Sequence, residues 1–271
     1  MPPQLPIVED MPIEEYHAHP YYSKTNIVHA RRSTQYVIDM RKNPPDPSPA
    51  QALGSAFHKI VLENGMVGEE IILVDAGVRR GKVWDEAVKN NPGKILLLAK
   101  ENEDLTPMVD SVRTHKRASQ LLKQGMPEVS FFAKLDLGED QLPVKCRPDW
   151  LPGALQIVDL KTAREVEPEP FGRAAYNFHY HWSAWLSCKI VELVTGQPHV
   201  YYFIATENKY PHTTVCYQVR PQVQWLAEQE IFPVLVRLAE AHNKNRFKEI
   251  APDTILDLEL PYWAMKRVVN E

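Results

Sequence analysis

The sequence predicts an α/β fold in a single domain spanning residues 1–271, with about the first 20 residues extended over its surface. Segments with helical apolar spacing alternate with short apolar runs that are typical of strands. No internal repeat or low-complexity tract interrupts this alternation. The chain has 271 residues, of which 44% are hydrophobic, and this is enough for one sizeable core.

The clearest helix signal begins at residue 48. Ser48 can cap the helix, Pro49 suits the first helical position, and Gln51 completes a capping box. The apolar stripe of this helix consists of Leu53, Ala56, Phe57, Ile60 and Val61. His58 lies beside the stripe, and by spacing alone such a histidine is more often structural than a ligand.

The remaining elements follow from apolar spacing and from turn residues. Further helices are predicted at residues 23–42, 82–90, 106–123, 170–194 and 221–245. Strands are predicted near Ile71 and Ile95, and at residues 129–137, 142–150, 155–162, 199–206 and 213–219. Ser23 suits the N-cap of the first of these helices, and Gly196 suits the end of the fourth.

Composition and charge exclude several classes of protein. A formal net charge of −4 argues against a protein that coats nucleic acid non-specifically. The three cysteines, Cys146, Cys188 and Cys216, form no CxxC pair, which argues against a disulfide framework, a thiolate zinc site or an iron–sulfur cluster. The longest apolar stretch, residues 95–99, is too short to cross a bilayer, and the first residues lack the pattern of a secretory signal. We therefore expect a cytoplasmic protein with no membrane partner.

Charged residues in the segment "KCRPDWLPGALQIVDLKTA" suggest a site. Asp159 and Lys161 share one face of a predicted strand because side chains two residues apart point the same way. A turn at residues 151–154 would set Asp149 nearly opposite Asp159 in an antiparallel hairpin. Two adjacent carboxylates repel unless a cation lies between them, and Mg²⁺ prefers such oxygen ligands. The pattern thus indicates a metal-dependent phosphodiesterase site.

Spacing alone does not distinguish such a site from a surface ion pair. Glu207 and Lys209 have the same acid-x-Lys spacing, but they lie in a polar turn. The segment 159–161 differs because it combines an apolar strand with a Pro-Asp pair ten residues upstream.

Several motifs together resemble a known family. "RPDW" followed by "IVDLKTA" resembles the PD-(D/E)xK nuclease superfamily, and specifically the RecE-type phage exonucleases (the exonuclease VIII group). "ALGSAFHKIVLE" resembles the helix that carries the family's metal-binding histidine, and "EEYHAHPYYSKTNI" resembles its N-terminal segment. "FGRAAYNFHYH", "YYFIATEN" and "LPYWAM" resemble later segments of the family. The likeness covers most of the chain and is weakest at residues 65–128.

The resemblance implies a restriction-endonuclease-like core, with a mixed central sheet flanked by helices. It implies that His58, Asp149, Asp159 and the Leu160 carbonyl bind Mg²⁺, for which Mn²⁺ would substitute. Asp149, Asp159 and Lys161 would be the catalytic residues, with Lys161 orienting the attacking water. Glu63 occupies a charged position of the histidine motif.

One departure concerns the helix after the catalytic strand. The family usually has Gln-x-x-x-Tyr there, and Ser183 and Ser187 occupy the two positions in this chain. It is therefore left open which residues support the lysine and the scissile phosphate. Nearby aromatic residues are expected to pack or to contact another subunit rather than to stack on bases; they are Tyr176, Tyr180, Trp182 and Trp185.

The resemblance implies a Mg²⁺-dependent 5′-to-3′ exonuclease that hydrolyses linear double-stranded DNA in phage-type recombination. Its implied partners are double-stranded DNA ends, further copies of the chain in a ring-shaped homo-oligomer, and a RecT-type single-strand annealing protein. Ser23, Lys24 and Arg31 are candidates for binding the 5′-phosphate, which requires cations and hydroxyl donors. The alternatives are an endonuclease of the same superfamily and a non-catalytic DNA-binding or assembly subunit.

Overall fold

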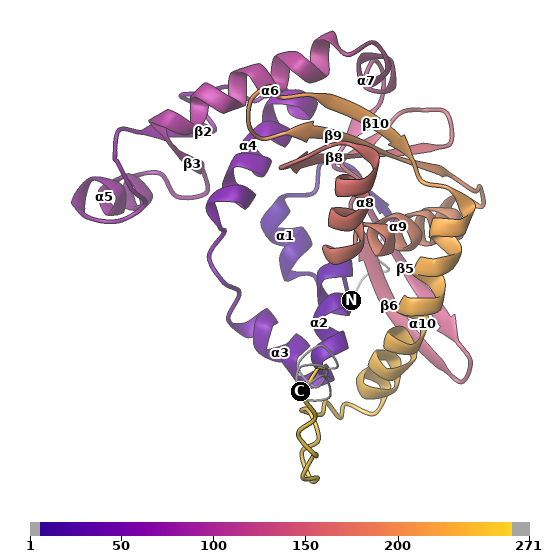
Figure 1. The fold of residues 1–271 in the computed structure, drawn as a ribbon. Helices are drawn as coiled ribbons and strands as arrows, with labels where there is room; N and C mark the ends of the chain where they lie inside the picture. Colours follow the sequence, from indigo (N-terminus) through magenta and orange to yellow (C-terminus); the bar gives the residue numbers. More distant parts are fainter. Residues whose placement is uncertain (1–5, 262–271) are drawn as a thin grey trace, which may run out of the picture.

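The computed structural model describes residues 6–261. In this part of the chain a five-stranded sheet has the order β10-β9-β8-β7-β4. Figure 1 labels β8, β9 and β10 of this sheet. Its strands are β4 (Met126–Pro127), β7 (Trp150–Leu151), β8 (Gln156–Ala163), β9 (Val200–Glu207) and β10 (Thr214–Gln218). Strands β8 and β9 run parallel, and the other neighbours run antiparallel. The expected mixed sheet is therefore confirmed.

Two smaller sheets accompany it. The first is antiparallel and has the order β1-β5-β6, with β1 at Ile7–Val8, β5 at Ser130–Leu137 and β6 at Asp140–Cys146. The second pairs β2 (Ile71–Val74) with β3 (Ile95–Leu98) in parallel.

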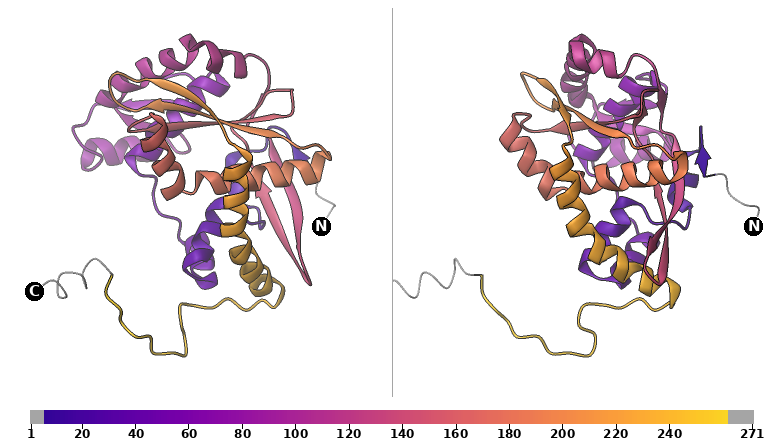
Figure 2. Two further views of the ribbon diagram at one scale, coloured as in Figure 1. Left: turned by 45° about the vertical axis from the view of Figure 1, so that its right-hand side comes forward. Right: turned by 90° about the vertical axis from the view of Figure 1, so that its right-hand side faces the viewer.

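Helices cover both faces of the five-stranded sheet (Figures 1 and 2). The α-helices of residues 6–261 are α1 (Ile13–Ala18), α2 (Lys24–Arg32), α3 (Thr34–Lys42), α4 (Pro49–Glu63), α5 (Lys82–Asn90), α6 (Asn102–Thr114), α7 (Lys116–Leu121), α8 (Pro168–Asn177), α9 (Tyr180–Thr195) and α10 (Pro221–Asn243). Strand β8 alternates between two cores. Val158 and Leu160 join the core with buried residues of α4 and α6, and Ile157 joins the core with buried residues of α9 and α10. Asp159 and Lys161 have the same parity as Ile157, so they belong to the α9 face.

The first turn of α4 confirms the predicted cap. Ser48 N–H donates to Gln51 Oε1 at 2.8 Å, and Gln51 N–H donates to Ser48 Oγ at 3.3 Å. Helix α5 has the predicted bounds, 82–90.

Three helices that the apolar pattern predicts as continuous are interrupted. The helix at 23–42 divides at Ser33, which has extended backbone angles and accepts the N–H of Tyr36 at 3.0 Å. The helix at 106–123 begins four residues earlier, at Asn102, and divides at His115. The helix at 170–194 divides between α8 and α9, where His179 has a φ of 55°. At Ser33 and at the α8–α9 junction the apolar spacing continues across the break, so it gives no sign of it.

The structure differs from the prediction at the N-terminal end of the described chain, and it adds a segment without helix or strand at the C-terminal end. Residues 13–18, which we expected to be extended, form α1. Residues 246–261, which follow α10, contain no helix or strand. Lys248 N–H donates to Thr34 Oγ1 at 2.8 Å, and the chain beyond it runs away from the rest of the protein (Figure 2). Residues 262–265 of the "LPYWAM" motif lie outside the described residues.

Candidate active site

The site forms where one edge of β8 lacks a partner strand. Strand β9 pairs with all of β8, but β7 pairs with the other edge through Trp150 and Val158. Side chains satisfy the next backbone groups on that edge, which belong to Leu160. The Leu160 N–H donates to Asp149 Oδ2 at 2.7 Å, and the Leu160 carbonyl accepts from His58 Nε2 at 2.9 Å. The unpaired edge of β8 thus collects polar side chains from two other segments, those of Asp149 and of His58 on α4.

The predicted hairpin places the two aspartates next to each other. The antiparallel pair Trp150–Val158 makes Asp149 and Asp159 the next opposed positions, and their carboxyl groups share a hydrogen bond. Asp159 is only 5% exposed and accepts hydrogen bonds from Lys161 Nζ and, at 2.8 Å, from the Tyr201 hydroxyl. Lys161 Nζ also donates to the Leu160 carbonyl at 3.1 Å. The structure therefore brings the two aspartates and the lysine together.

Helix α4 supplies His58. Its Nδ1 lies 3.5 Å from Asp149 Oδ2, while its Nε2–H donates a hydrogen bond to the Leu160 carbonyl. Burial and the nearby Lys161 charge lower the pKa of His58 to about 4, so the ring is neutral at physiological pH. A neutral ring that donates through Nε2 presents a lone pair on Nδ1 toward a carboxylate oxygen. Because His58 Nδ1 and Asp149 Oδ2 both present lone pairs, a cation can bind between them.

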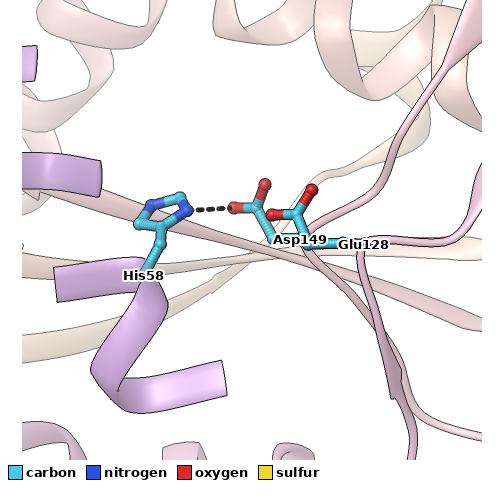
Figure 3. A group of neighbouring side chains, drawn as sticks. All are labelled: His58, Glu128 and Asp149. Atoms are coloured by element: carbon cyan, nitrogen blue, oxygen red, sulfur yellow. Dashed lines mark ion pairs between the residues drawn. The ribbon is translucent and has the colours of Figure 1, made fainter. Parts of the chain in front are cut away.

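Glu128 is a further member of the site that the sequence reasoning missed. Ligand atoms of His58, Glu128 and Asp149 all lie within 4.8 Å of one another (Figure 3). Glu128 N–H donates to the Asp149 carbonyl at 3.1 Å, and its carboxylate pairs with Arg147 Nε at 2.6 Å. A sequence signal did exist, because Arg147 stands in the RPD motif without an obvious acidic partner.

Charge is unevenly divided among the buried groups. Burial and the neighbouring Asp159 raise the pKa of Asp149 well above its ordinary value. Burial also opposes ionisation of Asp159, but Lys161 and the hydrogen bonds to Asp159 outweigh it and lower the pKa of that carboxyl. Burial disfavours the Lys161 ammonium, yet Asp159 and Asp149 raise its pKa above the ordinary value. The Lys161 side chain is therefore protonated at physiological pH in this arrangement.

Of the predicted phosphate-binding residues, Lys24 lies beside this group. Lys24 Nζ donates to the Phe178 carbonyl at 2.8 Å, and burial together with the Lys161 charge lowers its pKa to about 8. Arg31 Nη1 hydrogen-bonds His179 Nε2. Ser23 is engaged locally, since its hydroxyl donates to Asn26 Oδ1 at 3.3 Å.

The remaining predicted residues bond other partners. Glu63 is close enough to Glu128 for its charge to add to burial in raising the pKa of Glu128. Glu63 is exposed and pairs with Lys59 at 2.6 Å on the same helix. Ser187 is buried, and its hydroxyl bonds the Cys146 thiol. The Ser183 N–H donates to the His179 carbonyl at 3.3 Å. Burial of Ser187 in the core explains why a small residue fits there.

A family model described as "PDDEXK-like domain of unknown function (DUF3799)" matches residues 26–248. The crystal structure of a candidate exonuclease from Eubacterium rectale aligns with a TM-score of 0.65 at 12% identity, over 95% of this chain and 98% of that one. The crystal structure of SSO0001 aligns over 72% of this chain and 85% of its own at 13% identity, with a TM-score of only 0.31. Curated protein sequences give no match. Among residues 6–261, no helix is long and apolar enough to cross a membrane.

Proposed function

Because the chain belongs to the PDDEXK-like family DUF3799, we propose that it is a divalent-metal-dependent exonuclease that hydrolyses linear double-stranded DNA from its 5′ ends. One observation carries the proposal. The open edge of β8 gathers Asp149, Asp159, Lys161 and His58 around the Leu160 backbone, at the strand that carries the acid-x-Lys pattern. The fold shared with the Eubacterium rectale candidate exonuclease is consistent with it.

The residues present fit a divalent cation. His58 offers a neutral imidazole nitrogen, and carboxylate oxygens of Asp149 and Glu128 lie within 4.8 Å of it and of each other. Asp159, which shares a hydrogen bond with Asp149, would add an oxygen ligand of the kind that Mg²⁺ or Mn²⁺ accepts. The Leu160 carbonyl accepts from His58 Nε2 in this structure and would exchange that hydrogen bond for the metal. When bound, such a metal polarises a phosphate and makes water a better nucleophile.

The protein's own side chains have distinct tasks in this proposal. Lys161 stays protonated, so it donates hydrogen bonds to a water or to a phosphate oxygen and stabilises developing negative charge. Tyr201 holds Asp159 through Oδ2 and leaves Oδ1 directed at Lys161. Asp149 is held by the Leu160 N–H, which fixes the orientation of its carboxylate.

The 5′-to-3′ direction and the preference for duplex rest on the resemblance to RecE-type exonucleases. The test uses linear duplex labelled at either end, and the same duplex as a covalently closed circle, with Mg²⁺. We expect release of nucleotides from 5′ ends of the linear DNA and no attack on the circle. Equal attack on both forms would support the endonuclease alternative. No hydrolysis of either form would support the non-catalytic alternative.

Assembly and partners are part of the same proposal. We propose that further copies of the chain form a ring around the duplex, and that a RecT-type annealing protein receives the single strand. A ring would retain DNA by topology, which suits a chain with a net charge of −4. A native mass measurement would show a closed oligomer, whereas a monomeric mass would refute the ring.

A further inference from the structure

The break between α8 and α9 exposes an aromatic ring beside the site. Phe178 is the C-cap of α8 and is 62% exposed, whereas helix C-caps favour glycine or small polar residues. His179, which follows it, adopts a left-handed φ of 55° without being glycine. Such a conformation is unfavourable for a residue with a Cβ and persists only when its surroundings hold it.

Two cations of α2 hold this break. Lys24 Nζ donates to the Phe178 carbonyl at 2.8 Å, and Arg31 bonds the His179 ring. Lys24 and Arg31 are seven residues apart, so they lie on one side of α2. The His179 ring also stacks on Trp182 at 4.8 Å between ring centroids. The position of Phe178 is therefore fixed by contacts from a distant segment and is not that of a loose loop.

The Phe178 ring begins a short path to Lys161. It stacks on Tyr180, with ring centroids 5.7 Å apart and planes 28° apart. Tyr180 is anchored from behind by Phe171 and Phe203, with centroids at 6.4 Å and 6.0 Å. Lys161 Nζ lies 5.3 Å from the Tyr180 centroid, and Lys24 Nζ lies 5.9 Å from it. From the surface inward, the exposed Phe178 ring is thus followed by the Tyr180 ring, which lies near the ammonium groups of Lys24 and Lys161.

We propose that Phe178, supported by Tyr180, stacks on an unpaired nucleobase next to the phosphate held at Lys161. The inference rests on the proposed nuclease function and adds a binding site for a single-stranded end. Stacking suits a nuclease that must accept any sequence, because every base has a π face. Lys24 supplies positive charge beside the same ring, where the neighbouring phosphate of the strand would pass.

The test measures binding of a fluorescent oligonucleotide by anisotropy without added metal, so it does not depend on hydrolysis. Phe178→Ala is compared with the wild-type protein on a duplex with a short 5′ single-stranded tail, and on the same duplex with abasic tail residues. Loss of one stacked base corresponds to roughly tenfold weaker binding. We expect Phe178→Ala to bind the normal tail about tenfold more weakly and the abasic tail as the wild-type protein does. Phe178→Tyr keeps a ring and should restore wild-type binding.

Trp225→Ala is the matched control, because Trp225 on α10 is also 62% exposed. This variant should show the same difference in affinity between the normal and the abasic tail as the wild-type protein does. If Phe178→Ala weakens binding to both tails equally, or to neither, the stacking inference is wrong. If it changes the native mass of the protein and leaves the base dependence intact, Phe178 is a subunit contact instead. Failure of the separate hydrolysis assay would refute the nuclease function without altering these binding outcomes.

Discussion

Asp149 Oδ2 accepts the backbone N–H of Leu160 at 2.7 Å, across eleven residues of chain. The carboxylate thereby takes the place of a neighbouring strand at the open edge of β8. The same oxygen lies 3.5 Å from His58 Nδ1. One side chain therefore has two tasks, to complete the sheet and to present an oxygen to the site, and substitution can separate them.

Asp149→Asn and Asp149→Ala should differ in stability. Asparagine keeps an oxygen that accepts the Leu160 N–H and removes a carboxyl group that burial and Asp159 make unfavourable to ionise. We expect its free energy of unfolding, measured in urea without metal, to equal or exceed that of the wild-type protein. Alanine leaves the N–H without an acceptor and should lower this free energy by about 1–3 kcal/mol.

Metal ions should raise the midpoint of thermal unfolding of the wild-type protein, because they bind the folded state. Neither Asp149 variant should show a comparable rise with Mn²⁺. An Asn variant that is stabilised by Mn²⁺ as strongly as the wild type would remove Asp149 from the ligand set.

Lys161→Met should lower kcat by about 100- to 1,000-fold, the usual effect of losing a donor that stabilises developing charge. Lys209→Met is the matched control, since Lys209 has the same acid-x-Lys spacing but its side chain is 72% exposed and pairs with Asp104. The control should retain wild-type kcat on linear duplex. Equal losses in the two variants would contradict the assigned role of Lys161.

Glu128→Gln should weaken Mn²⁺ binding by roughly 10- to 100-fold, whether Glu128 binds the metal directly or orients Asp149. Isothermal titration of the purified variant measures the affinity. Because Glu128 also pairs with Arg147 at 2.6 Å, Arg147→Met is the companion variant. If both variants reduce affinity and stability to the same extent, Glu128 acts only through its ion pair.

Local signals predicted the parts of the fold that depend on neighbouring residues. The capping box at Ser48 and Gln51 lies within one turn, and the pairing of Asp149 with Asp159 follows from a four-residue turn. His58 is different, since apolar spacing favoured a structural role for it. Only the resemblance pointed to the site, and the structure places His58 against Asp149 and Leu160.

Features set by distant contacts could not be predicted from one sequence. The α8–α9 break depends on Lys24, which reaches Phe178 across 154 residues. Glu128, which follows β4 and has a φ of 52°, is held at the site by an ion pair with Arg147, which follows β6. Neither the apolar period nor a turn residue encodes such contacts, so the sequence predicts elements more reliably than their interruptions.

Lys145→Met tests a buried charge remote from the acidic cluster. Lys145 is 2% exposed, and its ammonium donates to the carbonyl of Tyr16 and, at 3.0 Å, to that of His19, where α1 ends. Burial and Arg41 lower its pKa from the ordinary 10.5 to about 8. Between pH 8 and 10.5 the unfolded chain therefore binds more protons at this residue than the folded protein does. The lysine's contribution to stability is lost as pH falls through about 8 and is fully present above 10.5.

Urea unfolding at pH 7.5 and pH 10 should show the wild-type protein gaining stability relative to Lys145→Met as pH rises. A difference between the two proteins that is constant over this range would mean that Lys145 keeps its ordinary pKa in the folded state.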